Sequence, residues 1–434
     1  MLVKCGPPGK TWTVLVYANG NNDMEPEIYR GIQAFGHKPA ADSTRVVVQL
    51  GRAPQRLVRT FRGHAGTPDG EQWDGVRRYV ACQSGLEQVA ALGRANMADP
   101  AALADFLCWG AANYPADYVM AILSGHGAGF IGLLTDYTQP YPMLMSVKGL
   151  TAALRQFRRK TGQRCAILVV DACYMNMIEI WYELAFTPTR PVRFLLTPLG
   201  EASLECLPYD VLVDALGVAA GRGYGVRRSL AAAVAAVNGT DKTSGDVLAV
   251  NLAADNFALL KAAVDELAGF IASSGVRLEA VLGADYRRSS HYPLANLLQF
   301  SRRLADSCPA CRSPYSALEA ALGRIIPVPP YAARPKLASL DASIFMPVTP
   351  GLYRCFAADY EHLLFAAGNR WPQILREDGS ADREAVSRPK RGGTTLPPPV
   401  AMSPESLVYS LQERSPDLTA EQARQKLREL GWRI

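Results

Sequence analysis

The sequence predicts an α/β fold in which a mostly parallel β-sheet is covered by helices on both faces. Short, nearly continuous apolar segments recur along the first half of the chain, and amphipathic segments of helical length separate them. Continuous apolar strands are typical of a sheet buried on both faces, because a half-exposed sheet would alternate apolar and polar residues. With 434 residues, 49% of them hydrophobic, the chain can bury a large core.

The expected strands and helices alternate as a parallel sheet requires. In chain order we expect a strand at 11–20, a helix at 25–35, a strand at 43–51, a helix at 99–114, a strand at 117–123, a helix at 147–159, and strands at 164–173 and 192–198. The helix at 99–114 has the clearest beginning, because Asp99 can cap it and Pro100 suits its first position. In such a sheet, functional groups gather at the carboxyl ends of the strands.

The second half of the chain has a different composition. Beyond about Val211 it is rich in alanine and helical in pattern, whereas residues 376–402 are charged, rich in glycine and proline, and without apolar periodicity. We expect four parts: a core unit at 10–215, its helical C-terminal part at 216–377, a flexible linker at 378–402 and a short helical tail at 403–434. The tail is too small for its own core, so we expect it to dock on the main body or on a protein partner.

Charge and composition argue against several classes of partner. The 46 basic and 40 acidic side chains give a net charge of +6 and are scattered, so we expect no nucleic-acid binding. No apolar run reaches the ~18 residues of a membrane span. Prolines at positions 7 and 8 interrupt the segment where a signal peptide needs an apolar core, so we expect a cytoplasmic protein. Cys308 and Cys311 lack the further ligands of a zinc site, and the nine cysteines show no disulfide framework.

Two of the expected strands end in reactive side chains. AILSGHG places His126 between Gly125 and Gly127, and AILVVDAC ends in Cys173. One helix-sized segment, 147–159, fits between these strands, so they are expected to be neighbours with both side chains at one edge of the sheet. The glycines let the chain leave the sheet sharply beside the imidazole.

A thiol and an imidazole at one edge can act as a nucleophile and its general base or acid. The thiolate attacks an acyl carbon, the imidazole protonates the leaving amine, and the backbone N–H groups of Gly127 and Cys173 hold the oxyanion. This chemistry requires no metal ion. Each residue alone also has a plainer reading, since a cysteine after a strand is often structural and a single histidine is often a satisfied polar residue.

Several segments around these residues resemble the clostripain-type cysteine peptidases, in that family's order along the chain. They are TVLVYANGNNDME, MADPAALADFLCWGAANYPADYVMAIL, SGHGAGF and VVDACYMNMIEIWYEL, with CLPYD and FAADYEHLLFAAGNRWPQIL further on. The similarity extends from about Lys10 to Leu375. It implies a caspase-like core and a cysteine endopeptidase whose catalytic dyad is Cys173 and His126.

The resemblance also implies a substrate with arginine or lysine before the scissile bond. The family has an acid two residues before the nucleophile, where this chain has Asp171, and a second pocket acid downstream, for which Glu201 is the candidate and Glu205 the reserve. A carboxylate at the first position can line the pocket, because residues i and i+2 of a strand point to the same side. Alternatively, Asp171 caps nearby N–H groups, and the two glutamates are solvated loop charges.

Departures from the family pattern lie beside the expected pocket. Phe130 replaces a tryptophan, Tyr174 and Asn176 stand where leucine and glycine are usual, and CLPY replaces GWPY at 206–209. These differences bear on substrate preference more than on the chemistry.

The resemblance also implies potential calcium dependence. The acids of 21–27 and Asp136 could supply oxygen ligands, but their spacing is not that of a calcium loop. We expect Asp23 to cap the helix that follows it.

Two other functions stay open on the sequence. The chain could be a caspase-like interaction protein with weak or no proteolysis that acts through its helical tail. It could also be a thiol amidase or acyltransferase that uses the same dyad on a small molecule.

Overall fold

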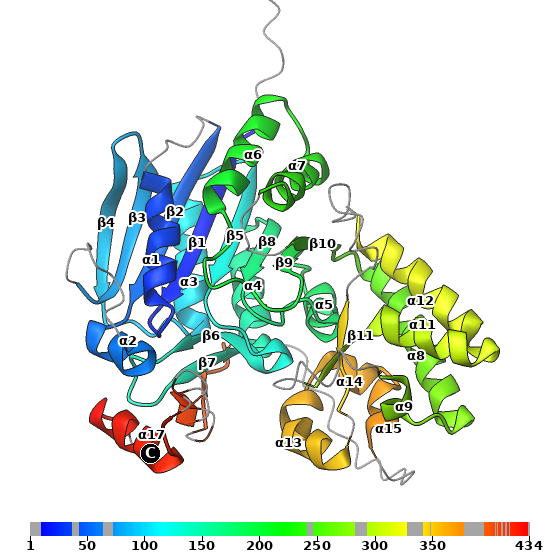
Figure 1. Cartoon of the computed structure of the whole chain (residues 1–434). Helices are drawn as coiled ribbons and strands as arrows, with labels where there is room; N and C mark the ends of the chain where they lie inside the picture. Colours follow the sequence, from blue (N-terminus) through cyan, green and yellow to red (C-terminus); the bar gives the residue numbers. More distant parts are fainter. Residues whose placement is uncertain are drawn as a thin grey trace, which may run out of the picture.

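A computed structural model gives the fold of the protein (Figure 1). It describes residues 10–36, 43–63, 73–240, 246–282, 293–327, 342–347, 349–376 and 395–403, and positions 405, 407, 408, 411, 412, 415 and 417–432 of the tail. Most of the expected linker, 377–394, and the start of the first tail helix at position 404 lie outside the described residues.

An eight-stranded mixed sheet forms the centre of the molecule, with the strand order β10-β9-β8-β5-β1-β2-β3-β4. Its strands are β1 (Trp12–Gly20), β2 (Thr44–Arg52), β3 (Gly75–Cys82), β4 (Gly85–Gly93), β5 (Tyr118–Ser124), β8 (Cys165–Asp171), β9 (Val192–Pro198) and β10 (Val247–Asn251). The five strands from β9 to β2 run parallel, whereas β3, β4 and β10 add antiparallel edges. The expected mostly parallel α/β sheet is therefore confirmed.

Helices cover both faces of this sheet. They are α1 (Glu25–Gln33), α2 (Gln55–Arg62), α3 (Pro100–Asn113), α4 (Val147–Thr161), α5 (Ile178–Phe186), α6 (Tyr209–Gly221) and α7 (Val226–Asn238). Strand β1 shows why two layers form: Val14 and Val16 pack in a core with α1, α6 and α7, while Leu15 and Tyr17 pack in a second core with α3, α4 and α5. The cap of α3 is as expected, since Asp99 accepts the N–H of Ala101 at 2.8 Å.

The antiparallel strands were not expected from the sequence, and their positions explain why. Strand β4 lies at the edge of the sheet and is largely exposed, so it carries no continuous apolar run. Strand β10 is a short apolar segment among alanine-rich helices. It comes from the expected C-terminal part, 216–377, and completes the same sheet, so that part is continuous with the core.

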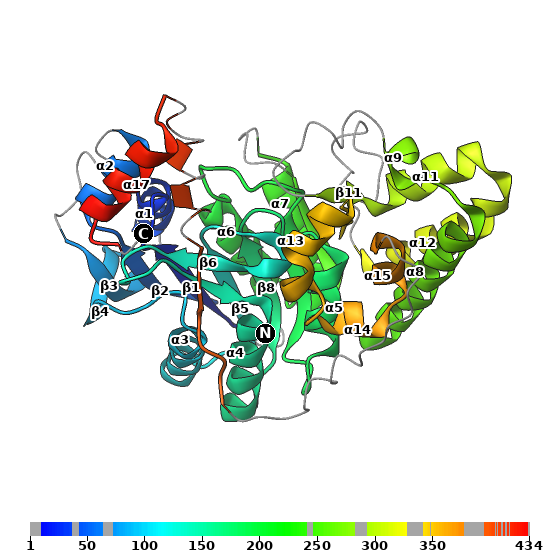
Figure 2. The ribbon, with the colours of Figure 1, turned by 90° about the horizontal axis from the view of Figure 1, so that it is seen from below.

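The remaining C-terminal helices extend the core beyond β10, at the end of the molecule opposite the tail (Figures 1 and 2). This region contains α8 (Ala254–Ser274), α9 (Leu278–Val281), β11 (Leu294–Asn296), α11 (Leu297–Ser307), α12 (Arg312–Ile325), β12 (Ser343–Phe345), α13 (Pro350–Tyr360), α14 (Leu364–Gly368) and α15 (Trp371–Leu375). Cys308 and Cys311 are free thiols here. Among the described helices, none combines the length and the apolar character needed to cross a membrane.

Two buried glutamates of α5 attach these C-terminal elements to the core. Glu179 is 0% exposed and accepts the N–H of Phe345 at 2.8 Å, and Glu183 accepts the N–H of Phe365 at 3.0 Å. Burial raises the pKa of each carboxyl to about 7, although the N–H donors partly oppose this rise. Both side chains therefore titrate near neutral pH in the folded protein.

This pair predicts a stability that falls with rising pH. The folded state holds protons that the unfolded state releases between pH 4.5, the ordinary pKa, and about 7, so the free energy of unfolding decreases across that window. Glu179→Gln keeps an oxygen acceptor and removes the titration, so it should flatten this decrease in urea unfolding measured from pH 5 to 8. The exposed Glu87→Gln is the control. An unchanged slope in Glu179→Gln would contradict the assignment.

The C-terminal tail docks on the main body, as expected. Strand β13 (Val400–Ala401) pairs antiparallel with β7 (Met143–Ser146), which also pairs with β6 (Gly132–Asp136). Helix α17 (Ala420–Glu429) begins with a capping box formed by Thr419 and Gln422. Tail side chains form a third, small apolar core with α2 and Tyr137; its buried members are Ala53, Leu57, Val58, Phe61, Tyr137, Leu407, Val408, Leu411, Ala423, Leu427 and Trp432.

Candidate active site

Neighbouring parallel strands bring His126 and Cys173 to one edge of the sheet. Strand β5 pairs with β8 in a register that places Ser124 opposite Asp171, and the N–H of Gly125 donates to the carbonyl of Asp171 at 3.3 Å. His126 and Cys173 each follow this matched pair by two residues. Both are partly exposed, with the His126 side chain 22% accessible. The predicted meeting of the two strand ends is therefore present and open to solvent.

Gly127 lies directly against the backbone of Cys173. A Cβ atom at position 127 would lie 2.2 Å from the carbonyl oxygen and 2.8 Å from the nitrogen of Cys173, so only glycine fits. The loop closes through two bonds of flanking residues: Ala128 N–H donates to Gly132, and Leu134 N–H donates to His126, both at 2.8 Å. The N–H of Gly127 takes no part in these two bonds.

A side chain at position 127 should therefore damage the site. Gly127→Ala should force the two loops apart, lowering the catalytic activity of the site strongly and the free energy of unfolding by about 1 to 3 kcal/mol. Gly221→Ala, at the end of α6 with open space around it, is the matched control and should change neither quantity appreciably. Equal activity of the two variants would show that the close approach is unimportant.

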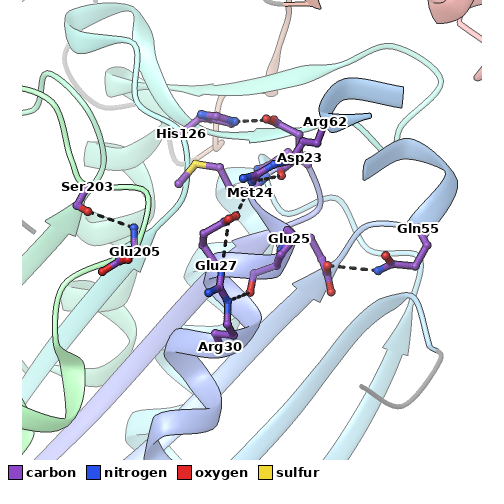
Figure 3. Close-up of polar contacts among 12 residues, drawn as sticks. Asp23, Met24, Glu25, Glu27, Arg30, Gln55, Arg62, His126, Ser203 and Glu205 are labelled. Atoms are coloured by element: carbon purple, nitrogen blue, oxygen red, sulfur yellow. Dashed lines mark hydrogen bonds and ion pairs between the residues drawn. The ribbon is translucent and has the colours of Figure 1, made fainter. Parts of the chain in front are cut away.

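Asp23 contacts the imidazole of His126, which the sequence analysis did not anticipate. The Nε2 atom lies 2.7 Å from Oδ1 of Asp23, a carboxylate that is 1% exposed, and Figure 3 shows the ring directed at it. The expected role of Asp23 as a helix cap is wrong. The N-cap residue of α1 is Met24, without a side-chain cap, and its N–H donates to Asn22 Oδ1 at 2.9 Å.

This contact determines which ring nitrogen can take part in chemistry. An ionised carboxylate only accepts hydrogen bonds, so Nε2 must carry the proton that faces Asp23. Nδ1 is then the nitrogen left for proton transfer. Asp23 itself is held from α2, because Arg62 donates to its carbonyl at 3.2 Å and to Glu27 at 2.6 Å (Figure 3).

Tyr137 lies against the His126 ring. The two ring centroids are 6.1 Å apart with an interplanar angle of 22°. The backbone N–H of Tyr137 donates to the carbonyl of Asn21 at 2.7 Å, in the same loop that carries Asp23. The imidazole therefore contacts both the Asp23 carboxylate and the Tyr137 ring, and the hydrogen bond from Tyr137 to Asn21 joins the two segments that carry these groups.

Asp136 fixes the segment around Tyr137 and is fully buried. It accepts bonds from the Asn21 side chain, the Met97 N–H, and the N–H and hydroxyl of Thr138, at 2.7 to 2.8 Å. Burial raises the pKa of its carboxyl against the effect of these donors. Within the part of the chain that the structure describes, no group of three or more His, Cys, Asp or Glu side chains could hold a metal ion. Calcium dependence stays a prediction.

Asp171 is 3% exposed and lies beneath the segment 206–209. It accepts the N–H of Leu207 at 2.9 Å and the hydroxyl of Tyr209 at 2.5 Å, both on Oδ2. Burial raises the pKa of this carboxyl, and its two donors lower it. Here the capping role considered for Asp171 is what the structure displays.

Cys206 occupies a backbone conformation that suits glycine. Its φ is +60°, at the position where the sequence pattern of the family has glycine. The side chain is buried against Gly31 of α1, and burial raises the pKa of its thiol. The departure at this position therefore changes the inner wall beside Asp171.

The two candidate glutamates lie on different sides of the loop after β9. Glu201 is exposed and accepts the hydroxyl of Tyr174 at 2.5 Å, next to Cys173, whose sulfur lies 4.0 Å from the Ala202 carbonyl. Glu205 is also exposed, but it lines a separate cavity of about 270 Å³ between α1 and α6. Of the two acids, Glu201 is therefore the one that flanks the Cys173 loop.

A thiol and an imidazole at matched strand ends of a mostly parallel, helix-covered sheet belong to a recognisable class, the cysteine-type peptidases with a caspase-like fold. The model of the clostripain family matches residues 76–273, which include His126, Asp171, Cys173 and Glu201 but not Asp23. Over these residues, fewer than half of the chain, the protein is similar to the clostripain-type cysteine peptidases, as the sequence motifs predict. Among curated proteins, none matches the sequence significantly.

Solved structures of similar fold agree with this similarity. An inactive zymogen of a C11 protease from Parabacteroides distasonis has 15% sequence identity and a TM-score of 0.57, with 83% of this chain and 98% of that chain covered. A secreted C11 cysteine protease from Bacteroides thetaiotaomicron, in complex with an irreversible peptide inhibitor, has 14% identity and a TM-score of 0.52, with 81% and 98% covered. At such identities the similarity supports the fold alone, and it confirms the caspase-like architecture.

Proposed function

We propose that this peptidase cleaves polypeptides after arginine or lysine, with Cys173 as nucleophile and His126 as general base and acid. One observation carries the proposal: the register of β5 and β8 pairs Ser124 with Asp171, so His126 and Cys173 each follow a neighbouring strand end by two residues. The buried carboxylate of Asp23 supports it, because it orients the imidazole as a catalytic ring requires.

In the proposed acylation step, Nδ1 of His126 removes the thiol proton of Cys173, and the resulting thiolate attacks the carbonyl carbon of the scissile bond. The negative charge that develops on the carbonyl oxygen is stabilised by the N–H groups of Gly127 and Cys173. His126 then donates the proton on Nδ1 to the leaving amine, which departs and leaves an acyl-enzyme. For deacylation, Nδ1 removes a proton from water, the hydroxide attacks the thioester, and the thiol group is regenerated as the acid product leaves.

Two acids support a preference for a basic substrate residue. Glu201 is exposed beside the Cys173 loop and can meet a guanidinium or ammonium group on entry. Asp171 lies deeper, and its two bonds from Leu207 and Tyr209 end on Oδ2, so Oδ1 would accept from the substrate. In this proposal Asp171 forms the floor of the pocket and Glu201 its rim.

Replacing the nucleophile tests the chemistry. Cys173→Ala should abolish cleavage of an arginine-containing peptide amide and keep the circular dichroism spectrum and melting temperature of the wild type. Cys355→Ala removes an exposed thiol elsewhere and should leave turnover unchanged. Full activity in Cys173→Ala would end the proposal.

Substituting the rim acid tests the preference. Glu201→Gln removes a charge and keeps the size of the side chain, so kcat/KM should fall for arginine and lysine substrates and not for a matched neutral substrate. Glu205→Gln, an exposed acid of the same loop, is the paired variant. If only Glu205→Gln changes the selectivity, the reserve residue is the pocket acid. If neither does, the rim role is wrong.

The remaining expectations stay predictions. A cytoplasmic location can be tested by fractionation, and calcium dependence by assay after chelation. An interaction function of the tail has less support, because many of its apolar side chains are buried against α2 and Tyr137. A small-molecule amidase or acyltransferase would show no cleavage of a mixed peptide library.

A further inference from the structure

We propose that the C-terminal tail of this chain positions the His126 imidazole, with Tyr137 as the positioning residue and Trp432 as its support. The inference rests on the proposed role of His126 in proton transfer. It makes Trp432, which is remote in sequence from both strand ends, a support behind the active site.

The first step is the contact between the tail and Tyr137. Trp432 is 5% exposed, and its ring lies edge-on to Tyr137 with 6.0 Å between centroids. Phe61 of α2 closes the cluster, at 5.3 Å from Tyr137 and 5.9 Å from Trp432. Edge-to-face packing of this kind fixes ring orientation as well as position. Tyr137 in turn stacks on His126, so the order of contact is Trp432, Tyr137, His126.

The second step is a route from the tail to Asp23. Phe61 packs in the tail core, and the next residue, Arg62, binds the carbonyl of Asp23 and the carboxylate of Glu27. Helix α2 is tied to the tail at its other end as well, because Arg56 donates to the carbonyl of Glu429. The tail therefore braces both groups that hold the imidazole, the tyrosine ring and the carboxylate.

The third step concerns how the tail is attached. Strand β13 pairs with β7, whose other neighbour is β6, the strand that leads into Tyr137. Figure 1 shows α17 next to α2 and the tail beside the β6–β7 hairpin. Loss of the tail would expose Phe61 and Tyr137 to water and remove the packing that restricts the Tyr137 ring.

Three substitutions in the full-length chain test this positioning. Trp432→Ala removes the contact with Tyr137, and Trp432→Phe keeps an aromatic ring there. Leu318→Ala, which truncates a fully buried side chain in α12 at the far end of the molecule, controls for loss of stability alone (Figure 2). For each variant the melting temperature, kcat and KM for a short arginine peptide amide are measured.

A second readout does not require activity. The ¹⁵N chemical shifts of histidine-labelled protein report which ring nitrogen of His126 carries the proton, with His126→Asn assigning the signal and Asp23→Asn showing the pattern without the carboxylate. This spectrum is recorded in the Cys173→Ala background. If the proposed peptidase chemistry is wrong, only the kinetic measurements fail. The tautomer of His126 still tests whether the tail positions the ring.

Trp432→Ala should lower kcat between about 10-fold and about 100-fold with little change in KM, and the His126 signal should shift from a single Nε2–H form toward a mixture. Trp432→Phe should recover most of both. Leu318→Ala should lower the melting temperature without either effect. The proposal is overturned if Trp432→Ala leaves both kcat and the tautomer as in wild type, or if Leu318→Ala alters them equally.

Discussion

The active site depends on how closely two backbone segments approach where β5 and β8 end. The parallel register of these strands sets Ser124 against Asp171, and the missing side chain of Gly127 lets the two loops touch. Because both strands are buried in the sheet and keep one register from Met120 to Ser124, the approach is fixed by the core and not by the loops. In the proposed mechanism, this approach holds the backbone beside Cys173 close to the backbone beside His126.

Around this contact, buried polar groups hold His126 in place. Asp23 and Asp136 are both nearly inaccessible: Asp23, in the loop after β1, contacts the His126 ring, and Asp136, at the end of β6, accepts a hydrogen bond from Asn21 of that loop. A polar network in such a setting is rigid only when its members are satisfied, since an unpaired buried group would be destabilising. Asp136 meets that condition through its four donors, whereas the buried Oδ1 of Asn21 in the same network accepts no hydrogen bond from the described residues.

Much of the fold is predictable from the sequence, because the buried parallel strands are continuous apolar runs and Asp99 marks a helix start. The edges are not, since β4 lacks a buried face and β10 lies within a helical composition. His126, Gly127 and Cys173 are predictable because each lies two or three residues after the end of a strand. Asp23 is not, because its place beside His126 depends on β1 being the neighbour of β5, and an acid before a helix also suggests a cap.

The tail adds a reciprocal constraint. The tail has too little apolar surface to fold alone, so packing on α2 and Tyr137 stabilises its folded conformation. The same packing stabilises α2 and Tyr137 in return. Any free energy that the tail gains by docking is shared with the arrangement of Tyr137 and Asp23, since Phe61, Arg62 and Trp432 belong to one packed cluster. By linkage, a change that weakens docking of the tail must also make the position of the His126 ring less restricted. Conversely, a ligand that restricts the His126 ring must strengthen docking of the tail.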